Sequence, residues 1–156
     1  MNADIFLTSQ AYLGQNPKNP FGSHKAARNL FNRALHNGFT HRLWGRLSGH
    51  STALRTLAHT PVDQPAARRR QIAFIPLEWI VGSESRNADF DNHFNPLKAH
   101  LVQRWVSIAI ARRNGVALPP VELIRNGNEF YVRDGHHRIS VAKMLGQMEI
   151  EAVIVN

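Results

Sequence analysis

Two histidines and an arginine occupy a short turn in the segment EFYVRDGHHRISVAKMLG, residues 129–146. The letters EFYVR alternate charged residues with aromatic or branched ones, which is typical of a strand. The letters RISVAKMLG repeat apolar residues at helical spacing and predict a helix that ends at Gly146. The turn GHHR therefore lies where a predicted strand ends and a predicted helix begins.

The start of a helix favours an anion, because its first backbone N–H groups lack helical partners and the helix dipole adds partial positive charge. Arg138 strengthens this prediction, since a guanidinium can hold two phosphate oxygens as a fork. Gly135 permits a close backbone approach, and Asp134 is predicted to cap the helix or, as an alternative, to bind Mg²⁺ beside a phosphate. His136 and His137 can donate to phosphate oxygens or exchange protons near neutral pH. The alternative is that Arg138 pairs with a nearby carboxylate and that the histidines take no part in chemistry.

A polar loop at residues 83–96, SESRNADFDNHFNP, supplies further candidates. Its carboxylates at Glu84, Asp89 and Asp91 can activate a hydroxyl or hold a metal ion. Arg86 can reach a second phosphate, with a structural ion pair as the alternative.

The chain of 156 residues has a net charge of +8, and the whole excess lies in its first half. Residues 1–71 hold ten lysines and arginines against two acidic residues, whereas residues 72–156 hold nine of each sign. This asymmetry predicts an electrostatic partner, with nucleic acid first and an anionic membrane surface second, while the alternative is an ordinary solvated basic face. The arginines predicted to contact nucleic acid are Arg42, Arg46, Arg68, Arg69 and Arg70.

The composition excludes several kinds of site. There are no cysteines, so disulfides and thiolate metal sites are excluded. No stretch has the pattern of a signal peptide or the apolar length of a membrane span, so we expect a cytoplasmic protein without a membrane partner. Three histidines recur every nine residues, a spacing that matches no metal site: His41, His50 and His59.

Helix-breaking residues divide the chain into a basic helical segment at residues 1–70 and an α+β domain at residues 71–156. The first part predicts several short helices, one of which ends at Asn37 and Gly38, and the stretch TPVDQPAARRRQ predicts a linker. Trp44 in this part is predicted to lie in the core.

The second part predicts the order β, α, β, β, α, β, with one sheet covered by helices. Its first strand is predicted over residues 72–82 and its first helix from Pro96 to Gly115. A hairpin turn is predicted at Asn126 and Gly127. Trp79, within the first strand, is predicted to lie in the core.

This order, together with the turn GHHR, resembles the ParB/sulfiredoxin superfamily, specifically the ParB-like nuclease-type domains, over residues 71–156. In these domains a glycine, two variable residues and an arginine open the helix after a strand, as Gly135 to Arg138 do here. The stretch IPLEWIVGSESRNADFD resembles a second box of the family, with Arg86 as the matching arginine. Glu84 is the nearest match to the catalytic carboxylate of the free-serine kinases in this superfamily.

The resemblance implies that the glycine-to-arginine turn holds nucleotide phosphates. Members of the superfamily include CTP-binding partition proteins, ATP-using sulfiredoxins, free-serine kinases and proteins described as nucleases. Sulfiredoxin chemistry is excluded here, because it needs a cysteine where His136 stands.

The sequence therefore predicts a ParB-like domain that binds a nucleotide (ATP, ADP or CTP) or a nucleic-acid phosphate, with DNA binding aided by the basic first part. The alternative is an enzyme that uses the same turn, either a Mg²⁺-dependent phosphotransferase or NTP hydrolase, or a ParB-like nuclease. The residues predicted to bind phosphate are Arg86, Asp134, Gly135, His136, His137 and Arg138. The candidate catalytic residues are Glu84, His136, His137 and Arg138.

Overall fold

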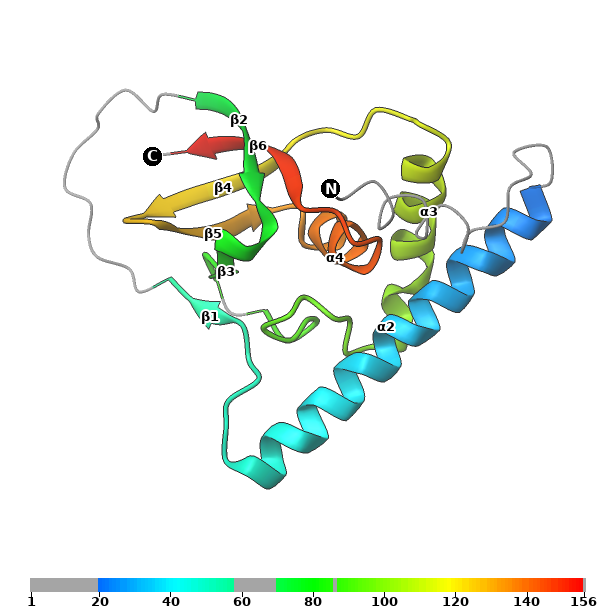
Figure 1. Ribbon diagram of the computed structural model, residues 1–156, viewed down its shortest axis with the longest axis horizontal. Coiled ribbons are helices and arrows are strands. Elements are labelled where there is room, and N and C mark those ends of the chain that lie inside the picture. Colours follow the sequence, from blue (N-terminus) through cyan, green and yellow to red (C-terminus); the bar gives the residue numbers. More distant parts are fainter. Residues whose placement is uncertain (1–19, 58–69, 86, 156) are drawn as a thin grey trace, which may run out of the picture.

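The structure, a computed structural model, describes residues 20–57, 70–85 and 87–155, which form three α-helices and one six-stranded sheet (Figure 1). The helices are α2 (Pro20–Ser48), α3 (Val102–Arg113) and α4 (His136–Met144). The strands are β1 (Arg55–Thr56), β2 (Arg70–Pro76), β3 (Ile80–Ser83), β4 (Val121–Asn126), β5 (Glu129–Asp134) and β6 (Glu149–Val155). The described chain is thus a mixed α and β structure with a single sheet, as predicted, while the ParB-like assignment of this fold stays a prediction.

The sheet has the strand order β1-β3-β5-β4-β6-β2. Strands β4 and β5 form the predicted antiparallel hairpin, in which Asn126 pairs with Glu129 and Gly127 turns the chain with a φ of 62°. Strand β5 also pairs in parallel with β3, and β4 pairs in parallel with β6. The strand that leads into the GHHR turn therefore has a partner on each side, which holds the end of β5 in place.

The helices are stacked outward from the sheet in the order α4, α3, α2 (Figure 1). Helix α4 contacts β4 and β6, and α3 lies between α4 and α2. Trp105 of α3 is fully buried and joins the three helices: its Nε1 donates to Oγ of Ser140 at 2.9 Å, and its ring meets the edge of Phe31 with centroids 5.7 Å apart. One hydrophobic core thus runs from the sheet to α2.

Helix α2 differs from the prediction of several short helices, because it continues through Asn37 and Gly38 as one helix of 29 residues. The physical reason is that Gly38 does not end the helix but lies close to another segment of the chain. A Cβ at Gly38 would lie 2.7 Å from the carbonyl oxygen of Pro96 and 3.2 Å from Cδ2 of Leu97. Gly38 therefore lets the helix lie against the loop before α3.

The single strand predicted over residues 72–82 is also wrong, since the chain forms β2, a 3₁₀ turn at Leu77–Trp79 and then β3. The two strands lie far apart in the sheet: β2 is an edge strand beside β6, and β3 lies between β1 and β5. The helix predicted from Pro96 begins later, at Val102, after a 3₁₀ turn at Ala99–Leu101. Splitting the strand brings Ser83, at the end of β3, next to the end of β5.

The two tryptophans predicted to be in the core are largely exposed: Trp44 is 70% exposed and Trp79 is 49% exposed. Residues from the first part of the chain nevertheless contribute to the core, through Ala27, Leu30 and Phe31 of α2. The boundary between residues 70 and 71 stays a prediction. In the described part of the chain, no helix is both long and apolar enough to cross a membrane.

Candidate functional site

The GHHR turn has the predicted local structure, because β5 ends at Asp134 and α4 begins at His136. Gly135 occupies the N-cap position with a φ of 108° and a ψ of 18°, which L side chains rarely adopt. A Cβ at Gly135 would lie 2.5 Å from Cγ1 of Val121 and 3.0 Å from Nη2 of Arg138. Glycine is therefore required here for both backbone conformation and space.

Replacing Gly135 with alanine is expected to lower the free energy of unfolding by roughly 2 to 4 kcal/mol, because backbone strain and the contact with Val121 add. Gly115→Ala is the matched control: Gly115 also has a positive φ, of 69°, but no atom lies within 4 Å of an added Cβ. That variant should lose about 1 kcal/mol. Denaturant unfolding of the three proteins measures both losses, and equal losses would contradict the argument from space.

No side chain in the described part of the chain caps the start of α4, so the prediction that Asp134 caps this helix is wrong. The Asp134 carboxylate instead accepts a hydrogen bond from Nη2 of Arg138 at 2.6 Å. The carboxylate of this ion pair is 60% exposed, and such pairs contribute at most about 1 kcal/mol. The first N–H groups of α4 therefore have no competing cap, and Arg138 can exchange its carboxylate for a stronger anion.

A cavity of about 400 Å³ opens at this turn. It is lined by Asn87, Asp89, Phe90, Arg104, Ser107, Ile108 and Leu118, together with residues 134–138. Arg104 from α3 and Arg138 from α4 bring two guanidinium groups to the cavity, while Phe90, Ile108 and Leu118 supply apolar walls. A cavity with convergent cationic groups and an apolar wall suits a small anionic molecule.

Two buried polar atoms at the turn have no hydrogen-bond partner among the described residues: Nε2 of His137 and Nε of Arg138. Leaving a buried polar atom unpaired costs about 1 to 3 kcal/mol, so most such atoms in proteins are paired. His136 differs, because its Nε2 lies 2.9 Å from Oγ of Ser83. The two unpaired atoms are enclosed by protein, and the pair between Ser83 and His136 holds the first of the two rings in place.

Burial lowers the pKa of both histidines. The two rings contact Phe90, with centroids 6.1 Å away for His136 and 5.2 Å away for His137. Loss of solvent is the main cause for each, and for His137 the positive charge of Arg104 adds to it and brings the pKa from 6.5 to about 4. Both imidazoles are therefore neutral at pH 7, when each can accept one hydrogen bond and donate another.

The free energy of unfolding is expected to fall as the pH drops from about 6.5 to about 4, because the unfolded chain binds a proton at His137 that the folded chain excludes. This stabilisation is fully present above pH 6.5 and is lost through the window down to pH 4. His137 should contribute about 2 kcal/mol after allowance for solvent screening.

His137→Gln, measured by denaturant unfolding across this pH window, should show a smaller loss of stability on acidification than the wild type. The control is His100→Gln at an exposed histidine, which should retain the pH dependence of the wild type. If the free energy of unfolding of His137→Gln depended on pH as that of the wild type does, His137 would not be the source of this pH dependence.

The candidate carboxylates of the polar loop have other contacts. The carboxylate of Glu84 accepts two hydrogen bonds from Arg133, at 2.8 and 2.7 Å, and Glu84 is not among the residues that line the cavity. Asp89 does line it and pairs with Lys98 at 2.7 Å. Arg86 lies outside the described residues. The structure thus brings Asp89, rather than Glu84, to the cavity with the GHHR turn.

The three described arginines among those predicted to contact nucleic acid do not form one cluster near the cavity. Arg42 and Arg46 are exposed near the end of α2, and Arg70 is exposed at the start of β2. The end of α2 and the start of β2 lie on opposite sides of the molecule in Figure 1. Arg68 and Arg69 lie outside the described residues.

Sequence reasoning missed Ser83 and Arg104, which the fold brings to the turn from 53 and 34 residues away in the chain. Neither residue type is unusual at its position. An arginine one residue before the buried Trp105, on the exposed side of a predicted amphipathic helix, is normally read as a solvated charge. Only the packing of α3 against α4 places it at the cavity.

Comparison of the chain with protein-family models, with curated proteins and with solved structures found no match in any of the three.

Proposed function

We propose that the cavity at the Gly135–Arg138 turn binds the phosphate groups of a nucleotide. The observation that carries this proposal is the uncapped helix start at the cavity, beside the guanidinium groups of Arg138 and Arg104. Backbone N–H groups, a helix dipole and arginine forks together are suited to phosphate. The resemblance of the turn to ParB-like domains, which hold nucleotide phosphates there, agrees with this proposal.

The size and walls of the cavity favour a nucleotide over a nucleic-acid backbone. A volume of about 400 Å³ is within the range of small-molecule sites, and a bare phosphate would leave much of it empty. Phe90, Ile108 and Leu118 give the base or sugar an apolar surface, which backbone phosphates do not need. The contribution of the basic first part to DNA binding stays a prediction, with Arg42, Arg46 and Arg70 as exposed candidates.

Thermal unfolding in the presence of ATP, ADP, CTP, GTP or inorganic phosphate, each with and without Mg²⁺, tests the proposal. At a hundred times its dissociation constant, a ligand adds about 2.7 kcal/mol to the free energy of unfolding and raises the melting temperature by a few degrees. We expect one nucleotide to give this shift and to give it at moderate salt as well as low salt, because a ligand in a cavity is screened less than an exposed backbone. The absence of a shift with every nucleotide would contradict the proposal.

Asp134→Asn is expected to strengthen nucleotide binding about threefold in the absence of Mg²⁺, because the substitution removes a negative charge and frees Arg138. If Asp134 instead holds Mg²⁺ against the phosphates, the same variant should bind more weakly than the wild type when Mg²⁺ is present. Calorimetric titration of both proteins, with and without Mg²⁺, separates the two roles. Weaker nucleotide binding by Asp134→Asn than by the wild type in the absence of Mg²⁺ would contradict the expected repulsion between the Asp134 carboxylate and the phosphates.

If the protein is an enzyme, as in the alternative prediction, the site needs a catalytic base as well as groups that bind phosphate. A phosphotransferase needs a base beside the bound phosphate, and the preferred candidate, Glu84, is held by Arg133 away from the residues that line the cavity. Asp89 is the carboxylate of the polar loop that lines the cavity, where Asp134 of the turn also lies. Turnover of whichever nucleotide binds, measured in the wild type and in Asp89→Asn, tests this alternative.

A further inference from the structure

A second cleft, of about 650 Å³, is lined by another part of the loop that borders the first cavity. Its walls come from α2, from α4 and from residues 93–95 of the loop, so it is separate from the cavity lined by residues 134–138. The polar lining includes Asn37, His41, His93, Asn95 and Lys143, and the apolar lining includes Trp44, Phe94 and Met144. None of the described residues that line it is acidic.

A buried carboxylate organises one wall of this cleft. Asp91 is fully buried and its carboxylate accepts four hydrogen bonds, between 2.8 and 3.0 Å: from Nδ1 of His41, from the backbone N–H of His93, and from the backbone and side-chain N–H groups of Asn95. Phe94, inside this loop, is buried and has a φ of 63°, which is uncommon for a residue other than glycine. Strained backbone that is held by a dense hydrogen-bond network is more frequent at functional sites than elsewhere.

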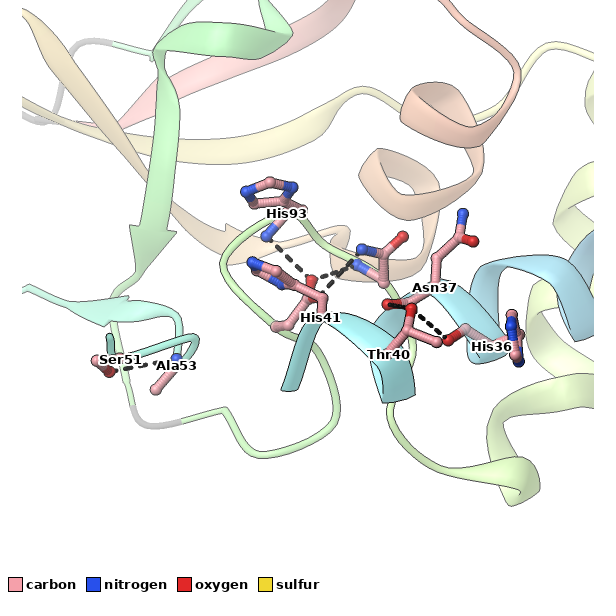
Figure 2. Close-up of polar contacts among 9 residues, drawn as sticks. His36, Asn37, Thr40, His41, Ser51, Ala53 and His93 are labelled. Atoms are coloured by element: carbon pink, nitrogen blue, oxygen red, sulfur yellow. Dashed lines mark hydrogen bonds and ion pairs between the residues drawn. The ribbon is translucent and has the colours of Figure 1, made fainter. Parts of the chain in front are cut away.

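The network places two imidazoles together at the cleft. Figure 2 shows His41, from α2, beside His93, from the loop, with Asn37 and Thr40 on the neighbouring turn of α2. The two imidazole centroids are 4.3 Å apart. Because the carboxylate of Asp91 can only accept, Nδ1 of His41 donates to it, and Nε2 of the neutral ring is then a hydrogen-bond acceptor.

A lysine completes the polar side of the cleft. The ammonium of Lys143, from α4, lies 4.8 Å from the ring centroid of Phe94. Burial lowers the pKa of Lys143, so an anion seated beside this ammonium would offset the cost of its lost solvent. Trp44, which is 70% exposed, and Met144 lie at the same cleft. They offer an apolar surface whose contact with water is unfavourable.

We propose that this cleft binds a small organic oxyanion with an apolar body, in which Lys143 holds the carboxylate or phosphate group and Trp44, Phe94 and Met144 contact the apolar part. Lys143 carries a formal positive charge and no acidic residue is among the described residues that line the opening, so a negative charge on the ligand is favoured. The proposal does not rest on nucleotide binding at the GHHR turn, since the two openings share no lining residue.

Methyl NMR of methionine-labelled protein tests the proposal, because the chain has three methionines and one of them, Met144, lines the cleft. The probes are benzoate and phenyl phosphate, with benzamide as the uncharged partner of benzoate. We expect benzoate or phenyl phosphate to shift the Met144 signal at millimolar concentration and to leave the signal of Met148, which is outside the cleft, in place. Which of the two probes binds more tightly tells whether the natural group is a carboxylate or a phosphate.

Lys143→Leu should weaken this binding about tenfold, since it removes a charged partner of the anion. The control Lys25→Leu changes the net charge equally at an exposed position of α2 and should change the affinity less than about twofold. Equal shifts with benzamide and benzoate, no shift with either anion, or equal effects of the two lysine variants would each overturn the proposal. Thermal unfolding of both variants confirms that they are folded at the temperature of the titration.

Discussion

Asp91→Ala is expected to lower the free energy of unfolding by about 4 kcal/mol, the largest loss of any single substitution considered for this protein. Without the carboxylate, the backbone N–H groups of His93 and Asn95 lose their acceptor inside the protein, and so does Nδ1 of His41. The loop would also lose the contacts that hold Phe94 in its unusual backbone conformation. Denaturant unfolding at pH 7 measures the loss.

Asp89→Ala is the matched control, because it removes the same side chain from the same loop. Asp89 is partly exposed and its carboxylate pairs with Lys98, so the expected loss is about 1 kcal/mol or less. A loss at Asp91 no larger than the loss at Asp89 would show that the hydrogen-bond network around Asp91 adds little to stability.

Arg138→Gln is expected to weaken nucleotide binding about thirtyfold, which corresponds to about 2 kcal/mol. The guanidinium lies at the helix start where phosphate would bind, and glutamine keeps a polar side chain but loses the charge and the fork. Calorimetric titration with the nucleotide that gives the largest thermal shift measures the change in affinity.

The control for Arg138 is Arg125→Gln, which has the same change of charge at an exposed position near the β-hairpin turn. Its affinity should stay within about twofold of the wild type, because its charge is far from the cavity and screened by solvent. The same loss in both variants would mean that net charge, and not the GHHR turn, governs binding.

The elements predicted well from the sequence are those whose signals are local. The β4–β5 hairpin follows from its Asn-Gly turn, and α4 follows from apolar spacing between Gly135 and Gly146. The candidate phosphate site was predictable for the same reason, since Gly135, His136, His137 and Arg138 are adjacent in the chain and depend only on where one strand ends and one helix begins.

The failed predictions concern residues whose role depends on distant partners. Gly38 resembles a helix breaker in the sequence, but in the fold it allows α2 to approach Pro96. The spacing of His41 from the next histidines matches no metal site and predicted no role for it. Its hydrogen-bond partner, Asp91, lies 50 residues later in the chain. Trp44 was predicted to lie in the core, yet it is 70% exposed. Such contacts are fixed by packing between elements, which local patterns do not report.

Amide NMR of the labelled wild-type protein tests most directly whether a nucleotide binds through the start of α4. On titration with ATP, ADP, CTP or GTP, we expect one nucleotide to give its largest shifts at the backbone N–H groups of Gly135, His136, His137 and Arg138, with smaller shifts at Arg104. Shifts confined to other parts of the protein, or no shifts with any of the four nucleotides, would contradict it.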